Sequence, residues 1–272
     1  LGLLIATGGL VWSTVGYLST KQGLPVVNQA LAWFLLLVSP TLPLLASLIS
    51  AQTHFHRLLT VYLALAPPFL LLSISYEVLF YFCFGAVLFL ALFLEQCWET
   101  RLPRTVTIQV DQQTYHPLVQ HDLFTSGLFL FLTNVGFFGT GNIASVSSFS
   151  LEAVSRLTTI FDPFLMGALL IFKILIPFFL LSAVLGIINR IKGLPPMAMF
   201  LLVLSTTDIM TVHFFYLVKD TGSWLEIGTT ISHFIIASLF VLFIIVLYLI
   251  SQLFTNGVEI SSLRPVLQKK VV

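Results

Sequence analysis

Apolar runs of about twenty residues, the length an α-helix needs to cross a bilayer, fill most of this sequence and are separated by short polar segments. The runs lack the strict alternation of apolar and polar residues that a membrane β-barrel requires, so they favour helices. Hydrophobic residues make up 58% of the chain and charged residues only 8%, which excludes a soluble globular domain. We therefore expect an all-α, polytopic membrane protein.

The runs predict a helical bundle of about eight transmembrane spans, followed by a short tail. The expected spans are residues 1–18, 26–49, 58–75, 78–95, 118–138, 163–187, 197–218 and 228–254. They form one membrane domain, residues 1–254, and residues 255–272 form the tail. The chain begins at Leu1, inside an apolar run, so we expect it to be a fragment or a cleaved product.

Lysine and arginine predict which loops face the cytosol, because positive residues are retained on that side. With eight spans, both chain ends lie on one side. That side carries Arg57, Arg101, Arg104, Arg190, Lys192, Arg264, Lys269 and Lys270, and the other carries Lys21, Arg156 and Lys219. The tail is thus expected in the cytosol, and the loops at residues 139–162 and 219–227 on the lumenal or extracellular face.

The tail ends in Lys-Lys-Val-Val, which places Lys269 and Lys270 where the dilysine retrieval signal of endoplasmic-reticulum membrane proteins places its lysines. Such a signal is read by a receptor and works only on a cytosolic tail, where the charge distribution already puts this one. The alternative is that the two lysines are a basic flank that anchors the final helix.

A glycine-rich break follows the fifth expected span, with glycines at positions 136, 139 and 141. Apolar residues recur at helical spacing from Leu151 to Phe161, which predicts an amphipathic helix lying in the lumenal membrane interface. Asp162 is suited to cap the sixth span, and Pro163 to occupy its first position, where a missing amide costs least.

Few ionisable residues lie well inside the apolar runs, and they are Lys173, Asp208, His213 and His233. A charge at the centre of a membrane helix costs about 2.5–3.5 kcal/mol on insertion scales, so it needs a partner or a use. We expect Asp208 to pair with Lys173. Such a pair would either fix helix packing or hold a polar lipid headgroup. The two histidines are expected to be hydrogen-bonded within the bundle.

Other polar residues indicate no catalytic or metal site. The two cysteines provide neither a disulfide framework nor a thiolate cluster. His54 and His56 would diverge on a helix, and the group His116, His121 and Asp122 is read as a solvated helix entrance. The net charge of +1 and the lack of basic runs with interleaved aromatics give no support for nucleic-acid binding.

Three colinear strings in the second half of the chain carry a family resemblance. They are FFGTGNIASVSSF from residue 137, FDPFLMGALLIFKILIP from residue 161 and STTDIMTVHFFYLVKDTGSWLEIGTTISHFII from residue 205. Together they resemble the C-terminal membrane region of the GPI ethanolamine phosphate transferase 1 family. The resemblance implies residence in the endoplasmic reticulum and transfer of phosphoethanolamine from phosphatidylethanolamine to the first mannose of GPI-anchor precursors.

In that family, catalysis belongs to a lumenal domain with two zinc ions and a threonine nucleophile, N-terminal to the region that this chain resembles. The resemblance therefore implies zinc in the absent domain, no cofactor in this chain and no catalytic residue here. The membrane part is expected to bind and present phosphatidylethanolamine and mannosylated GPI precursors, with Asn142, Lys173 and Asp208 as candidate substrate-binding residues. A transporter or channel and a non-catalytic scaffold subunit are the alternatives left open.

Overall fold

The computed structural model describes residues 2–20, 24–49, 52–102, 104, 106–110, 113–140, 154–158, 161–219, 221–255 and 258–259. Its helices are α1 (Gly2–Ser19), α2 (Val26–Val38), α3 (Leu42–Ile49), α4 (His54–Leu72), α5 (Ser75–Arg101), α6 (Gln120–Gly139), α7 (Pro163–Ile191), α8 (Ala198–Leu217) and α9 (Trp224–Thr255). The 3-10 turns are η1 (Ser39–Thr41) and η3 (Val154–Arg156).

Eight helical segments of the described chain are long and apolar enough to cross a membrane, which confirms the predicted number of spans. One of them, Val26–Leu45, combines α2, η1 and the start of α3. The 3-10 turn that interrupts it contains Pro40, whose ring removes a backbone donor from the helical ladder. The chain is therefore a multi-pass helical membrane protein.

Two short strand pairs are the sheet structure of the described residues. β2 (Ile108–Val110) and β3 (Gln113–Tyr115) form an antiparallel hairpin in the segment between α5 and α6. β1 (Gln52–Thr53) pairs in parallel with β4 (Val258–Glu259), with Thr53 opposite Glu259. The second pairing holds the end of the described chain beside the start of α4.

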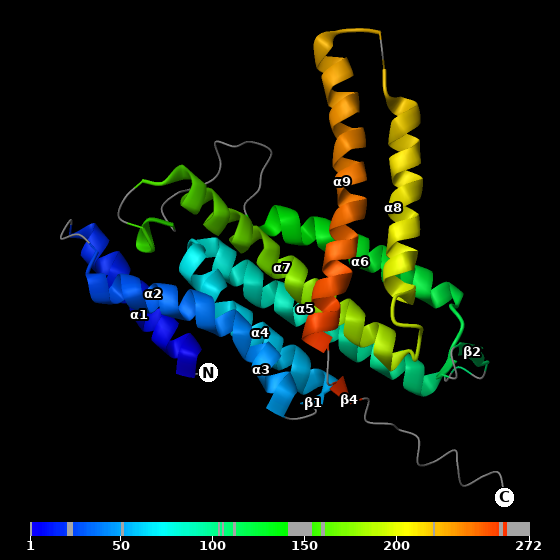
Figure 1. The fold of residues 1–272 in the computed structure, drawn as a ribbon, viewed down its shortest axis with the longest axis horizontal. Helices are drawn as coiled ribbons and strands as arrows, with labels where there is room; N and C mark the ends of the chain where they lie inside the picture. The colour runs from blue at the N-terminus through cyan, green and yellow to red at the C-terminus, as the bar shows by residue number, and fades with distance from the viewer. Residues whose placement is uncertain are drawn as a thin grey trace, which may run out of the picture.

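Helix α7 is the centre of the packing, and it contacts α4, α5, α6 and α9 (Figure 1). Helix α5 presents one buried stripe, in which Tyr81, Phe84, Leu88 and Leu92 follow one another at three- or four-residue spacing. That spacing places the four side chains on a single helix face, packed in the same hydrophobic cluster as α7. The core is thus built on the inward faces of the central helices.

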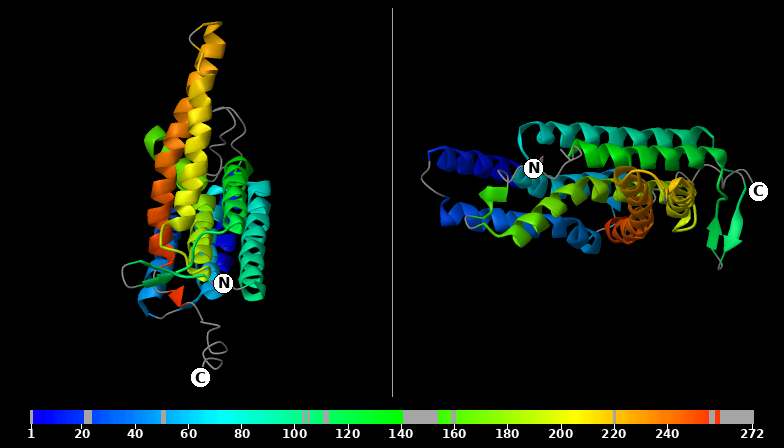
Figure 2. Two further views of the ribbon diagram at one scale, coloured as in Figure 1. Left: turned by 90° about the vertical axis from the view of Figure 1, so that its right-hand side faces the viewer. Right: turned by 90° about the horizontal axis from the view of Figure 1, so that it is seen from above.

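The α8–α9 hairpin crosses the other helices at a large angle, and its far half projects beyond them (Figures 1 and 2). The buried residues of α9 lie mostly in its C-terminal half, from Ala237 to Thr255, where it packs on α7. The projecting half exposes large apolar side chains such as Ile209 and Trp224.

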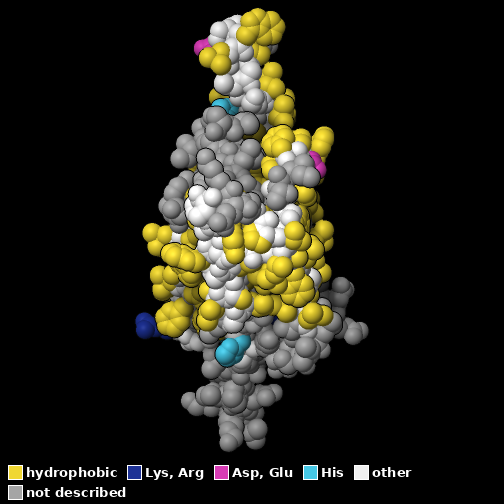
Figure 3. Space-filling model, turned by 90° about the vertical axis from the view of Figure 1, so that its left-hand side faces the viewer, with side chains coloured by type: hydrophobic (Ala, Val, Ile, Leu, Met, Phe, Trp, Pro, Cys, Tyr) yellow, Lys and Arg dark blue, Asp and Glu magenta, His cyan; other side chains and the backbone are white. Residues whose placement is uncertain are grey.

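Hydrophobic side chains also cover much of the described surface elsewhere (Figure 3). Trp12 is 85% exposed and Phe131 is 63% exposed. Large apolar side chains in contact with water would be unfavourable, whereas lipid tails are as apolar as these side chains. The exposed apolar surface therefore fits a bundle surrounded by lipid.

Candidate functional site

Glu77 lies where α4 gives way to α5, in the first turn of α5. Its Oε2 accepts a hydrogen bond of 2.7 Å from the backbone N–H of Ile74, in the short link between the two helices. A carboxylate at a helix N-terminus satisfies free amides and complements the helix dipole. Glu77 therefore fixes the start of α5.

The other carboxylate oxygen of Glu77 binds Lys173. Lys173 Nζ donates to Glu77 Oε1 at 2.6 Å, and the two side chains are only 7% and 4% exposed. Lys173 lies ten residues after Pro163, about 15 Å along α7 at the usual helical rise. An ammonium in this apolar setting needs a counter-charge, and Glu77 provides it.

The predicted pairing of Lys173 with Asp208 is therefore wrong. Asp208 is exposed on α8, whereas Lys173 is buried where α7 meets α5. Glu77 sits one residue before the expected fourth span, in the expected link between two spans, whereas α5 begins at Ser75 and includes it. The sequence feature that could have indicated Glu77 as the partner is an acidic residue in the first turn of a helix.

The segment before α7 is attached to the same place. Arg156 is buried, and its Nη1 donates to the backbone oxygen of Ser73, the C-cap of α4, at 3.0 Å. Trp33 and Gln29 of α2 both donate to the backbone oxygen of Leu157, at 3.1 and 3.0 Å. These bonds hold the described part of the loop at residues 139–162 against α2 and the α4–α5 link.

The predicted interfacial helix is described only in part. Val154–Arg156 forms a 3-10 turn, and residues 151–153 and 159–160 lie outside the described residues. The helix as a whole thus stays a prediction. Asp162 does cap α7 as expected, since its Oδ1 accepts from the N–H groups of Phe164 and Leu165 at 3.0 and 3.3 Å.

A second cluster of buried charges lies at the opposite end of the bundle. Asp122, at the start of α6, is fully buried. Its carboxylate accepts two hydrogen bonds from Arg104, at 2.7 and 3.1 Å, and one from Lys192, at 3.0 Å. Arg104 also binds Glu99 at 2.9 Å, and Lys192 Nζ lies 3.0 Å from Glu95. We call these five residues the ionic cluster.

The ionic cluster corrects the interpretation of His116, His121 and Asp122 as a solvated helix entrance. His121 is partly buried, stacks on Trp98 at 4.4 Å between ring centroids, and has Nε2 3.2 Å from Glu95. His116 Nδ1 lies 2.8 Å from the backbone oxygen of Val106. Asp122 is buried because Arg104, from the segment before α6, and Lys192, at the end of α7, pack on it. Residues close to Asp122 in the sequence could not reveal that burial.

Arg104 shows how strongly the ionic cluster is held. Burial alone lowers the pKa of a guanidinium, but the hydrogen bonds from Arg104 to Asp122 and Glu99 outweigh it, and the pKa of Arg104 lies above its ordinary value. The bidentate contact with Asp122 matches the planar guanidinium to a carboxylate. The cluster therefore joins the ends of α5, α6 and α7.

Two lysine–glutamate pairs now relate α5 to α7. Glu77 and Glu95 are eighteen residues apart, five full helical turns, so they lie at the two ends of the same buried stripe. Their partners are nineteen residues apart: Lys173 lies on α7, and Lys192 is the C-cap of the same helix. The pairs run in the same order along both helices, so α5 and α7 are parallel and their register is fixed at both ends.

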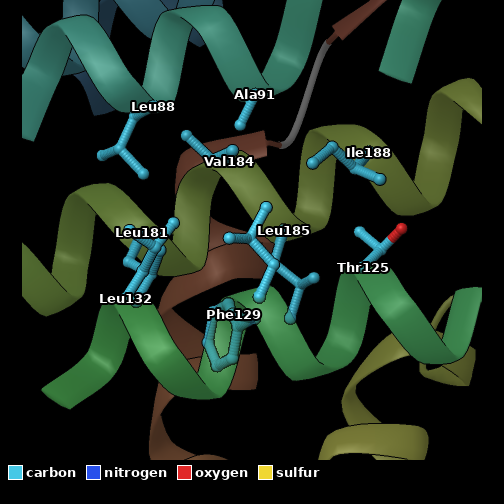
Figure 4. Close-up of a pocket in the computed structure, with 10 residues that line it drawn as sticks. Leu88, Ala91, Thr125, Phe129, Leu132, Leu181, Val184, Leu185 and Ile188 are labelled. Carbon is cyan, nitrogen blue, oxygen red and sulfur yellow. The ribbon is translucent and has the colours of Figure 1, made fainter. Parts of the chain in front are cut away.

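A small apolar cavity of about 20 Å³ lies between these helices (Figure 4). Leu88 and Ala91 of α5, Phe129 and Leu132 of α6 and Leu185 of α7 are among its lining residues. An apolar void of this size stays dry and has no room for a lipid. Its one polar wall, Thr125, already bonds to Glu95 and Lys192.

The remaining candidate residues are not brought together. Asn142 lies outside the described residues. His213 and His233 are exposed on the projecting hairpin, where His233 stacks on Phe214 with ring centroids 5.8 Å apart. They are therefore not bundle-interior histidines. Within the described ranges, no three histidine, cysteine, aspartate or glutamate side chains gather as a metal site would require.

Comparisons with known proteins agree with one another. The family model of phosphatidylinositolglycan class N (PIG-N) matches residues 1–223. Proteins named GPI ethanolamine phosphate transferase 1 from Gibberella zeae and Yarrowia lipolytica are 44% and 46% identical to the chain, over 96% and 95% of its length. The chain spans 27% of the length of each of these relatives.

A similar protein from Candida glabrata, with the same name, is 41% identical over 90% of the chain and 26% of its own length. No solved structure matches the chain. The family match covers well over half of the chain, including both Lys173 and the ionic cluster. The chain belongs to the phosphatidylinositolglycan class N (PIG-N) family.

Proposed function

We propose that this chain is the membrane part of an endoplasmic-reticulum enzyme that transfers phosphoethanolamine from phosphatidylethanolamine to the first mannose of GPI-anchor precursors. The observation that carries the proposal is the similarity, over almost the whole chain, to proteins named GPI ethanolamine phosphate transferase 1. Because the chain spans about a quarter of their length, the chemistry is assigned to the rest of the full-length protein.

The two-zinc chemistry expected of the family is placed outside this chain. Two-metal phosphoryl transfer needs clustered carboxylate and imidazole ligands that stabilise the attacking and leaving oxygens. The described acidic side chains form no such group; they bind lysine or arginine, cap a helix or stand alone. The role left for this chain is to bind and present two lipid substrates.

The Glu77–Lys173 pair is the proposed headgroup site. An ammonium carries three N–H donors, and among the described residues Lys173 gives one to Glu77. The other two are suited to phosphate oxygens of a lipid that approaches from the loop at residues 139–162, which the sequence places at the lumenal surface. Glu77 then holds Lys173 Nζ at that end of the bundle.

Asn142 and Asp208 complete the proposal. Asn142 belongs to the same loop, where its amide can both donate to and accept from a headgroup. Asp208 is exposed on a helix that is apolar enough to cross a membrane. A carboxylate there is costly unless it binds a cation, and the ethanolamine ammonium of the donor lipid has the matching charge.

The experiment measures transfer by the full-length protein. Lys173→Met should weaken transfer of labelled phosphoethanolamine from phosphatidylethanolamine to a mannosylated GPI precursor, at normal expression. Lys219→Met is the matched control, because Lys219 is an exposed lysine in the loop between α8 and α9 and should leave transfer unchanged. Equal transfer by both variants would remove Lys173 from the proposal.

The alternative classes give different outcomes in the same assay. A transporter, channel or scaffold predicts that the full-length wild-type protein transfers no phosphoethanolamine. Such a result with correctly folded protein would refute the transferase proposal as a whole.

Localisation to the endoplasmic reticulum is part of the proposal and has its own test. Lys269 and Lys270 lie outside the described residues and are proposed as a retrieval signal on a cytosolic tail at residues 255–272. Replacing both lysines by serine should allow the full-length protein to leave the endoplasmic reticulum. Unchanged localisation would favour the simpler role of a basic flank.

A further inference from the structure

Buried polar atoms without a partner gather at one place in the described structure. Four buried side-chain nitrogen or oxygen atoms have no hydrogen-bond partner there, and they are His54 Nδ1 and Nε2, Arg57 Nη2 and Ser251 Oγ. His54 and Arg57 are three residues apart on the first turns of α4, so they share a face. Ser251 lies one turn before Phe254 on α9, and the backbone oxygen of Phe254 accepts from Arg57 Nε at 2.6 Å.

Among the described residues, the charge at this place is also uncompensated. Arg57 is 1% exposed, and it gives two hydrogen bonds to neutral backbone oxygens, those of Phe254 and Pro43. Arg190, at the end of α7, is near enough to repel Arg57 and has no carboxylate partner among the described residues. Two guanidinium groups that repel each other without an anion between them are unfavourable in a buried setting.

The carboxylates whose side chains the structure describes at this end of the bundle are already paired. Glu95, Glu99 and Asp122 bind Lys192 and Arg104 in the ionic cluster. The start of α4 adds to the positive potential. The side chain of Thr53, the N-cap residue, accepts no hydrogen bond from the first backbone N–H groups of the helix. The unpaired donors, the repulsion between the two arginines and the uncapped helix start therefore all favour a bound anion.

We propose that His54, Arg57, Arg190 and Ser251, hereafter the Arg57 junction, bind a phosphate group, carried by a phospholipid or free in solution. Arg57 Nη2, Ser251 Oγ and a ring N–H of His54 can each donate to phosphate oxygens. The junction lies at the ends of three candidate spans, the level of lipid headgroups. Basic pockets between helix ends on the cytoplasmic side suit phospholipid phosphates, and the charge distribution assigns this end to the cytosol.

The Arg57 junction is separate from the proposed headgroup site. It lies at the first turns of α4, whereas Glu77 and Lys173 lie beyond its last turn. The two ends of α4 are about 27 Å apart, eighteen residue steps of 1.5 Å each. A lipid bound there belongs to the opposite leaflet. The proposal therefore stands or fails independently of the transferase assay.

The test uses delipidated full-length protein and measures thermal stability as ligand is added. One series adds mixed micelles of phosphatidylcholine with phosphatidylinositol, and the other adds inorganic phosphate. The wild type should be stabilised, and Arg190→Gln should need about tenfold or more ligand for the same shift, because a charged hydrogen-bond donor is lost. Arg101→Gln is the matched control, since Arg101 is an exposed arginine at the same end of the bundle.

A second variant covers the case in which Arg190→Gln folds poorly. His54→Phe removes two buried nitrogen atoms that have no partner, so it should raise the stability of the ligand-free protein and weaken the response to ligand. A rise in stability with an unchanged response would show a packing defect and overturn the proposal.

The two series identify the source of the phosphate. A response to micelles alone supports a phospholipid, and a response to inorganic phosphate supports a free anion. The absence of any response in the wild type, or equal responses of Arg190→Gln and Arg101→Gln, would overturn the proposal.

Discussion

The buried Glu77–Lys173 pair makes a quantitative prediction about three variants of the full-length protein. Glu77→Gln keeps an oxygen that can accept from the N–H of Ile74, and Lys173→Met keeps the unbranched shape of the lysine. Each single variant removes one charge and leaves the other buried. The double variant removes both charges from an otherwise intact apolar site.

The expected magnitudes follow from the geometry. At the 2.6 Å distance between Nζ and Oε1, two unit charges attract by about 6 kcal/mol at an effective dielectric constant of about 20. Breaking a buried pair by removing one partner typically costs about 3–5 kcal/mol, whereas replacing both partners is close to neutral. We expect each single variant to lose about 3 kcal/mol, the double variant to lose less than about 1 kcal/mol, and the coupling to be about 5–6 kcal/mol.

The assay is equilibrium unfolding of the purified protein in mixed micelles as the fraction of SDS is raised, followed by tryptophan fluorescence. The four proteins form a double-mutant cycle, which isolates the interaction between the two side chains. If the double variant is as unstable as the sum of the single variants, the coupling is near zero and the two groups do not form a pair in the membrane.

Transfer activity measured on the same four proteins separates packing from substrate binding. If Lys173 only holds α7 against α5, the double variant should recover transfer together with stability. If Lys173 also binds lipid phosphate, the double variant should recover stability but not transfer. Full recovery of both would leave the pair as a packing element and remove Lys173 from the proposed headgroup site.

Three further predictions concern the stability of the same protein in the same unfolding assay. Lys192→Met should cost about 3–5 kcal/mol, because Glu95 loses its lysine partner in a buried setting; a loss below about 1 kcal/mol would contradict the burial of that pair. Gly186→Ala should cost about 1–3 kcal/mol, because its Cβ would clash with Ser251 Oγ, and adding Ser251→Ala should recover most of the loss. Asp162→Ala should cost about 1 kcal/mol through the lost cap of α7, whereas Asp162→Asn should cost much less, and equal losses would argue against the cap.

The eight spans and the start of α7 could be predicted because their causes are local. A run of about twenty apolar residues needs only a bilayer to become a helix, and Asp162 followed by Pro163 starts a helix through contacts within four residues. The charge pairs could not be predicted in this way. Glu77 and Lys173 are 96 residues apart, and composition gives no reason to prefer Glu77 over Asp208.

The ionic cluster shows the same limit at the other end of the bundle. Taken singly in the sequence, three of its members look like solvated loop charges: Arg104, Asp122 and Lys192. Two of them, Arg104 and Lys192, served only to predict which side of the membrane their loops face. Lys192 reaches Asp122 across 70 residues of chain, because α7 returns parallel to α5. Burial of these charges depends on that return.

The sequence by itself determined that the chain is a membrane protein with eight expected spans and which family it resembles. Only the tertiary structure decided which charges neutralise each other, that α5 and α7 are parallel with a register fixed at both ends, and that Arg57 and Arg190 have no carboxylate partner among the described residues. The physical reason is that hydropathy acts on each segment separately, whereas an ion pair depends on the distance between two side chains, and that distance exists only once the helices have packed.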